Sequence, residues 1–242
     1  MIPYKTYGEL FSIGPFHVQT WGTMVAIGFL VGLLIVTLEV RRRKLNLDHV
    51  YALALSLFIG GVLGARIGWI LTEAPNGMSF FDYFNIWNGG MISFGGLIGG
   101  LMLMGAYAYY KKIKILEYLD VFAIGIPLGM AIGRVGCYLI GDHLGKGTVM
   151  PWAILHYGQL THPVILYEIM LLLGIFALML FLKDRRLPEG SLFATYLFSY
   201  SLGRFVIDFA RVEQTYFGLT IAQHACIALL IISGVWIMRR RH

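Results

Sequence analysis

Charged side chains are scarce in this sequence of 242 residues, since Asp, Glu, Lys and Arg make up only 13% of it. A soluble domain carries about 25%, so the composition excludes an ordinary soluble protein. Cysteine occurs only at Cys137 and Cys226, too rarely for a disulfide framework. A P-loop, a dinucleotide fingerprint and a regular spacing of metal ligands are also missing. We therefore expect no cofactor and no bound metal.

Hydrophobic residues are abundant instead, at 58%. They gather in runs that approach or reach the roughly 20 residues needed for one membrane crossing. We predict an all-α integral membrane protein with one transmembrane domain over residues 1–242. The predicted spans are seven, at about Val18–Val40, His49–Leu71, Gly90–Tyr110, Leu116–Val135, Pro163–Lys183, Ser191–Ile207 and Leu219–Met238.

The segments between these runs are expected to be short, apart from an external loop region at about 137–161. Pro3 and Pro15 should discourage regular structure in an external segment over residues 1–17. Residues 73–90 are also placed outside, and FFDYFNIW within them is a candidate interfacial helix.

Thirteen of the 19 Lys and Arg residues stand in four clusters, each after an apolar run. Two runs separate each cluster from the next, which is the positive-inside pattern of a multi-span protein. The pattern puts the N-terminus outside and the C-terminus in the cytoplasm. It also attributes the net charge of +6 to topology, so we expect no nucleic-acid partner. The clusters are Arg41–Lys44, Lys111–Lys114, Lys183–Arg186 and Arg239–Arg241.

The other six cations all fall on the predicted external side: Lys5, Arg66, Arg134, Lys146, Arg204 and Arg211. Arg66, Arg134 and Arg204 close the three outward-running spans at similar depth, each beside a glycine. Each could independently extend to the membrane interface. Alternatively, the three could share an anionic ligand, and we favour a phospholipid phosphate because guanidinium binds phosphate bidentately.

Two carboxylates fall close to these arginines. Asp208 shares a helical face with Arg204 and Arg211, so we expect it to orient Arg204, with influence on a reacting proton as the alternative. Glu168 lies inside an apolar run, where a carboxylate needs a partner. We expect it to pair with an arginine or with Tyr138.

Four segments, in this order, resemble one family over nearly the whole chain: GGLIGG at 95–100, GRVGCYLIGDHLG at 133–145, HPVILYE at 162–168 and YSLGRFVIDFAR at 200–211. The family is the prolipoprotein diacylglyceryl transferases of bacterial inner membranes. The resemblance implies transfer of a diacylglyceryl group from phosphatidylglycerol to the lipobox cysteine of a prolipoprotein signal peptide. The product is a thioether, glycerol 1-phosphate leaves, and the site faces the outer side of the cytoplasmic membrane.

The resemblance also assigns residues. Arg134, Arg204, Gly145 and Tyr200 match family positions, and Asp142 takes the place of a signature glutamate. The expected catalytic residues are Arg134, Arg204, Asp142, His143 and Asp208. The expected substrate-binding residues are Arg134, Arg204, Arg66, Gly95, Gly96, Tyr200 and Gly145, where the two glycines of GGLIGG allow close approach by a helix or by a ligand.

Several positions depart from the family pattern. Phe94 stands where the family usually has a histidine proposed to accept a proton, and Cys137 and Ile140 stand where asparagines are usual. Trp21 stands where a tyrosine is common. The candidate substitutes for the base are His143, Asp142, His162 and His156. Cys137 could be a nucleophile, although a small buried filler is the simpler interpretation.

Phe94 therefore leaves a rival open, a phospholipid-binding paralogue without the transfer activity or with altered specificity. A lipid or anion transporter ranks last, because transporters place charged sites near the membrane midplane.

Overall fold

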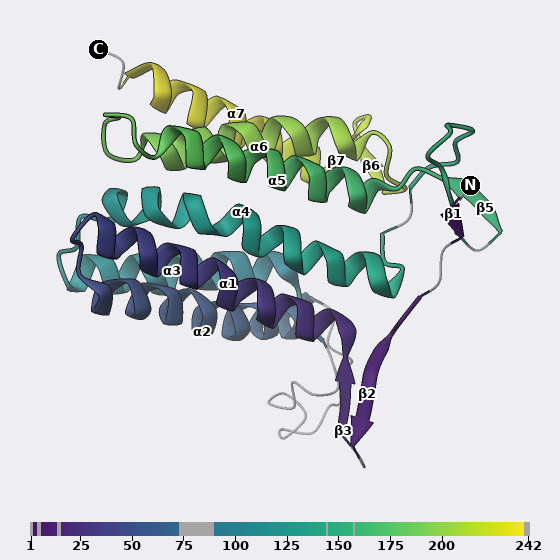
Figure 1. Ribbon diagram of the computed structural model, residues 1–242, viewed down its shortest axis with the longest axis horizontal. Coiled ribbons are helices and arrows are strands. Elements are labelled where there is room, and N and C mark those ends of the chain that lie inside the picture. Colours follow the sequence, from purple (N-terminus) through teal and green to yellow (C-terminus); the bar gives the residue numbers. More distant parts are fainter. Residues whose placement is uncertain are drawn as a thin grey trace. The chain divides into compact units, whose positions relative to one another are not determined.

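The computed structural model describes residues 2–3, 6–13, 16–72, 90–143, 145–156 and 158–239 (Figure 1). Seven helices lie in these residues, each overlapping one of the seven predicted spans. They are α1 Thr20–Arg42, α2 Leu47–Thr72, α3 Ser93–Tyr110, α4 Ile115–Ile140, α5 Val164–Leu182, α6 Ser191–Asp208 and α7 Ile221–Arg239.

Five of these helices are long and apolar enough to cross a membrane: α1, α2, α4, α5 and α7. Their outer faces carry exposed leucines such as Leu30, Leu34 and Leu38 of α1, a surface suited to lipid rather than to water. The other two helices have 18 residues each. Helix α3 is rich in glycine and tyrosine, and α6 carries Arg204 and Asp208. The architecture is that of a helical membrane protein, while the count of seven spans and their orientation stay predictions.

The chain divides into two compact units, one of Met1–Glu39 with Leu116–His242 and one of Val40–Ile115. In the first unit, α4, α5 and α6 share a buried core of Ala123, Ile124, Ile175, Met179, Leu192 and Tyr196. Helices α5, α6 and α7 lie side by side in Figure 1, with α6 contacting both others.

One polar contact fixes the start of α6 to α4. Gly190, the N-cap of α6, has no side chain with which to cap the helix. The buried carboxylate of Asp120 on α4 does so instead, accepting hydrogen bonds from the backbone N–H of Gly190 at 2.7 Å and of Phe193 at 2.9 Å. A carboxylate at a helix N-terminus also interacts favourably with the helix dipole.

The second unit consists of the end of α1 with α2 and α3, and glycines bring α2 and α3 together. A Cβ atom added to Gly95 would lie 2.3 Å from the carbonyl oxygen of Gly64 and 3.1 Å from Cα of Gly68. Of the two approaches expected at Gly95, the one by a helix is therefore present. Such close backbone contact is typical of membrane helices, whose association gains little from the hydrophobic effect.

We predict that Gly95→Ala destabilises this unit by about 1–3 kcal/mol, because the added methyl group meets backbone that cannot rotate away. Gly105→Ala on the same helix is the matched control, since nothing lies within 4 Å of its Cβ position. Thermal unfolding of both variants in detergent gives the comparison, and equal stability of the two would contradict the packing role.

Two sequence predictions about the polar segments are wrong in part. Residues 1–17 are not irregular throughout, because β2 (Glu9–Ile13) pairs antiparallel with β3 (Phe16–Gln19), and β1 (Ile2–Pro3) pairs parallel with β4 (Ile154–His156). The predicted loop 137–161 contains the last turn of α4, as well as β4 and β5 (Gln159–Thr161). A further short hairpin, β6 (Thr215–Tyr216) with β7 (Leu219–Thr220), precedes α7. The candidate interfacial helix FFDYFNIW lies wholly outside the described residues.

Candidate functional site

Glu168 on α5 is the centre of a buried cluster of arginines in the first unit. Its side chain is only 4% exposed. Oε2 lies 2.7 Å from Nε of Arg134, which comes from α4. Oε1 accepts hydrogen bonds from Arg204 of α6 and from Arg211, the latter at 2.9 Å. The prediction that Glu168 pairs with an arginine is confirmed, and the number of arginines is three.

Asp208 forms a second carboxylate centre next to the first. Its Oδ1 lies 3.1 Å from Nη2 of Arg204 and 3.7 Å from Nε of Arg211. The three side chains therefore lie together as predicted, although Arg211 comes after the end of α6 and not on its helical face. Both distances are short enough for ion pairs. Neither contact is a hydrogen bond, since Oδ1 has no hydrogen-bond partner among the described residues. The other oxygen, Oδ2, accepts a hydrogen bond from the hydroxyl of Thr220. Asp208 thus pairs with Nη2 of Arg204, whereas Glu168 pairs with Nη1.

The three arginines differ in how far they are open to a ligand. The side chain of Arg134 is 22% exposed, that of Arg204 11% and that of Arg211 4%. Arg211 is also held by Glu213, at 2.9 Å. Arg134 and Arg204 are therefore the cations that an incoming anion can reach, and Arg211 is part of their support.

The end of α4 places three further chemical groups beside Arg134. Gly141 adopts a left-handed φ of 77°. The N–H of Gly141 bonds the carbonyl of Tyr138, and the N–H of Asp142 bonds that of Cys137. This is a Schellman motif, and it folds Asp142 back towards the last helical turn. Cys137 itself is buried and is an electrostatic neighbour of Arg134.

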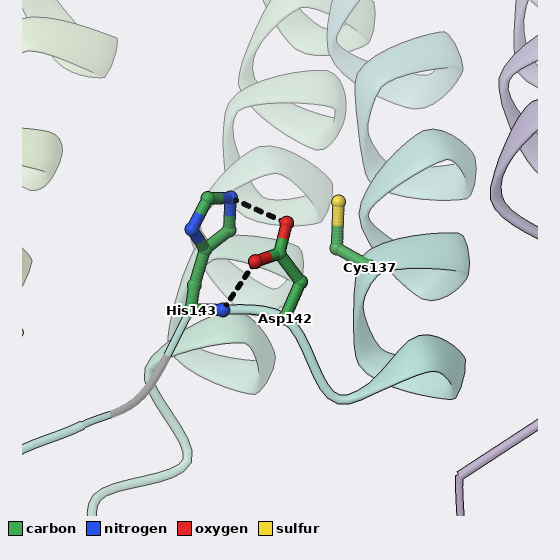
Figure 2. A group of neighbouring side chains, drawn as sticks. All are labelled: Cys137, Asp142 and His143. Carbon is green, nitrogen blue, oxygen red and sulfur yellow. Dashed lines mark hydrogen bonds and ion pairs between the residues drawn. The ribbon is translucent and has the colours of Figure 1, made fainter. Parts of the chain in front are cut away.

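His143 follows Asp142 and contacts it directly. Its Nε2 lies 3.3 Å from Oδ2 of Asp142, and its backbone N–H donates to Oδ1 at 2.9 Å (Figure 2). Partial burial lowers the pKa of the His143 imidazole below its usual value, and the positive charge of Arg211 lowers it further, against the opposing effect of Asp142. Of the proposed bases, Asp142 and His143 are thus adjacent to each other, and His143 is within electrostatic reach of Arg134.

A small pocket opens beside this pair, lined by Tyr138, Asp142, His143, Gly145, Ile154, Thr161, His162, Pro163, Val164 and Ile165. Gly145 allows two backbone segments of the pocket wall to lie close together, because a Cβ atom at this position would lie 2.1 Å from the carbonyl oxygen of His162. The hydroxyl of Thr161 is buried and has no hydrogen-bond partner among the described residues. His162 contacts the hydroxyl of Tyr167 at 3.2 Å.

Tyr200 lies on α6, stacked on Tyr196 with ring centroids 6.1 Å apart. It is an electrostatic neighbour of both Arg134 and Arg204, and its role in binding a substrate stays a prediction. The side chain of His156, another candidate base, is outside the described part of the structure.

Arg66, Gly95, Gly96 and Phe94 belong to the second unit. Arg66 is buried, with Nη1 donating to the carbonyl of Gly90 at 3.0 Å and the guanidinium 4.5 Å from the ring centroid of Trp69. Phe94 is 54% exposed. The contacts within the first unit thus join Arg134 to Arg204, whereas the shared role of Arg66 stays a prediction.

Sequence reasoning missed the central position of Glu168 and the support given by Arg211 and Thr220. A carboxylate within an apolar run indicated that a partner existed. The number of partners could not be inferred, because they come from α4, α6 and the segment after α6.

A buried arginine–carboxylate cluster held by apolar helices defines a helical membrane protein built around a polar site. Residues 9–239 match the family described as prolipoprotein diacylglyceryl transferase. The chain is 32% identical over 228 residues to a phosphatidylglycerol–prolipoprotein diacylglyceryl transferase of Clostridioides difficile (strain 630), a match that covers 93% of this chain and 91% of that protein.

Proteins of the same name give similar matches in other bacteria. The one from Streptococcus equi subsp. zooepidemicus (strain MGCS10565) is 30% identical over 242 residues, covering 95% of this chain and 93% of the relative. The one from Thermotoga maritima is 31% identical over 238 residues, covering 93% and 81%. The chain therefore belongs to the prolipoprotein diacylglyceryl transferase family, a family of transferase enzymes, and the resemblance inferred from its four segments is confirmed.

Proposed function

We propose that this protein transfers the diacylglyceryl group of phosphatidylglycerol to the lipobox cysteine of prolipoproteins. The transfer takes place at the outer face of a bacterial cytoplasmic membrane that the chain crosses seven times, with its N-terminus outside. Family membership supports the reaction, and the placement of the basic clusters supports the topology.

The chemistry explains why arginines are needed. The cysteine sulfur forms a bond to the terminal glycerol carbon of the diacylglyceryl group, and the bond from that carbon to the phosphate oxygen breaks. Glycerol 1-phosphate leaves with the bonding electron pair, and the thiol proton passes to a base. Negative charge therefore grows on the phosphate in the transition state, where preorganised cations in a site of low dielectric stabilise it strongly.

The observation that carries the proposal is the pairing of Arg134 and Arg204 around Glu168. Glu168 and Asp208 hold the two guanidinium groups in fixed positions before a substrate binds, which lowers the cost of ordering them. In this proposal Arg134 and Arg204 bind the phosphate, Tyr200 lies beside them, and Glu168, Asp208 and Arg211 are positioning residues. Asp142 and His143 are the groups proposed to accept the thiol proton.

The decisive experiment incubates the purified protein with a lipobox peptide and vesicles of phosphatidylglycerol. A mass increase of one diacylglyceryl group on the peptide is expected. Vesicles of phosphatidylcholine and a peptide with serine in place of the cysteine are the controls. Asp142→Asn, His143→Gln and His162→Gln, run in the same assay, identify the proton acceptor. Binding of phosphatidylglycerol without any thioether product would favour the rival function, a lipid-binding paralogue.

That rival is motivated by Phe94, which cannot accept a proton. We predict that Phe94→His changes the transfer rate by less than about tenfold if another group serves as the base, since general-base catalysis contributes ~10²–10⁴-fold. Initial rates of the variant and the unmodified protein give the comparison, with Phe94→Gln as a polar control. A gain of about 10²-fold specific to histidine would show that a missing base limits this protein.

A further inference from the structure

Cys137, Asp142 and His143 bring three metal-binding atoms together at the end of α4. One donor atom from each residue lies within 4.8 Å of the other two. The closest measured pair is Nε2 of His143 and Oδ2 of Asp142, at 3.3 Å. Cys137 and Asp142 meet because the Schellman motif folds the chain back at the end of α4, so two residues five positions apart in the sequence are neighbours in space.

The arrangement does not suit a nucleophilic triad. In such a triad the imidazole stands between the thiol and the carboxylate, so that it can take the thiol proton. Figure 2 shows the opposite order, with the carboxylate of Asp142 between the imidazole ring and the sulfur. A ring of one sulfur, one oxygen and one nitrogen donor is instead a set that Zn²⁺ binds.

We propose that Cys137, Asp142 and His143 form a binding site for Zn²⁺, a function separate from the transfer reaction, in which Asp142 and His143 of the metal-free protein are the proposed proton acceptors. Ligands of a tetrahedral zinc ion lie about 3.4–3.8 Å apart, so the pair at 3.3 Å already has the required spacing. The sulfur must approach by at most about 1 Å. On binding, the thiol becomes a thiolate and releases its proton to solvent.

Two features of the surroundings favour a cation here. The C-terminal end of a helix carries partial negative charge, and the ligands lie at and just after the end of α4. The positive charges of Arg134, Arg204 and Arg211 act against the metal, but Glu168, Asp208 and Glu213 already pair with them. The carboxylate of Asp142 therefore adds a negative charge beyond those that already pair with the arginines.

The fourth position of the ion would open to the pocket beside Asp142 and His143. Thr161 lines the same pocket, and its buried hydroxyl has no partner in the described residues. A water molecule on the metal would give that hydroxyl the hydrogen bond that a buried polar group requires. Three protein ligands and one water are the usual shell of an open zinc site.

Titration with Co²⁺ tests the proposal, because cobalt–thiolate bonds absorb in the near ultraviolet. Full-length protein without a histidine tag is first stripped of metal with EDTA. The expected result is one Co²⁺ per chain with a thiolate band, displaced by one Zn²⁺, which binds such sites more tightly. Cys137→Ser should remove the band, and the matched Cys226→Ser, at the other buried cysteine, should keep it.

His143→Gln is the second variant, because its partly exposed side chain can change without disturbing the fold. It should weaken Co²⁺ binding by at least about tenfold, as even indirect partners of a metal contribute that much. A missing thiolate band in the unmodified protein, or a band that survives Cys137→Ser, would overturn the proposal. Both readouts are independent of transfer, so a failed transfer assay leaves this inference standing, and the reverse.

Discussion

Replacing Arg134 by alanine is expected to lower the rate of diacylglyceryl transfer by at least about 10³-fold while the protein still inserts and folds. Removing one preplaced donor to a developing oxyanion costs ~10²–10³-fold in other enzymes, and an arginine on a transferring phosphoryl group is worth ~10³–10⁵-fold. Arg134 is the most exposed of the three clustered arginines, so it is the one expected to make the most contact with the phosphate.

The fold should survive because Arg134 contacts only one carboxylate oxygen of Glu168, Oε2. The other oxygen keeps Arg204 and Arg211, so the buried carboxylate stays paired. Transfer to the lipobox peptide and melting temperature in detergent are both measured. Arg186→Ala, in an exposed turn between α5 and α6, controls for loss of a positive charge. Arg134→Lys should recover only part of the rate, because an ammonium group lacks the bidentate geometry. Full activity in Arg134→Ala would contradict the role of Arg134 in binding phosphate.

Glu168→Gln is expected to lower the stability of the protein more than Arg134→Ala does. The carboxylate balances parts of three guanidinium groups in a site with almost no exposure. Removing one partner of a buried ion pair costs about 3–5 kcal/mol, because the remaining charge loses its compensation. In a protein of this size, that corresponds to a fall in melting temperature of roughly 6–20 °C.

The amide of glutamine keeps the shape of Glu168, so the loss measures charge rather than packing. Glu189→Gln, in the exposed turn before α6, is the matched control and should leave the melting temperature unchanged. Transfer should fall as well, since Arg134 and Arg204 would no longer be held in place. A Glu168→Gln variant as stable as the unmodified protein would show that the arginines have other sufficient partners.

The helices could be predicted closely because hydropathy is a local property. The observed bounds of α2 and α5 lie within two residues of the predicted ones. The error at α4 is larger, since a helix predicted to end near Val135 continues to Ile140. The polar and glycine-rich composition after Arg134 suggested a loop, while the Schellman hydrogen bonds at Gly141 keep the extra turn helical.

Contacts between distant residues could not be read from the sequence. The parallel pairing of Ile2 with Ile154 joins segments about 150 residues apart, through strands too short to give a pattern of their own. The cluster around Glu168 has the same difficulty, because periodicity places a side chain on a face of its own helix only. Arg204, Asp208 and Arg211 were predicted together from their spacing of four and three residues, and they do lie together, although α6 ends at Asp208 and Arg211 follows it.

The cap of α6 by Asp120 has a consequence for the alignment of the site. Arg134 lies 14 residues after Asp120, and Arg204 lies 14 residues after Gly190. Two helices joined at those starting points rise together by about 21 Å over that length, and both arginines then reach Glu168. The contact between the Asp120 carboxylate and the start of α6 therefore fixes the position of Arg134 relative to Arg204 along the two helices. Inserting one residue into either interval would turn its arginine by about 100° around the helix and move it about 1.5 Å along the axis, out of step with its partner.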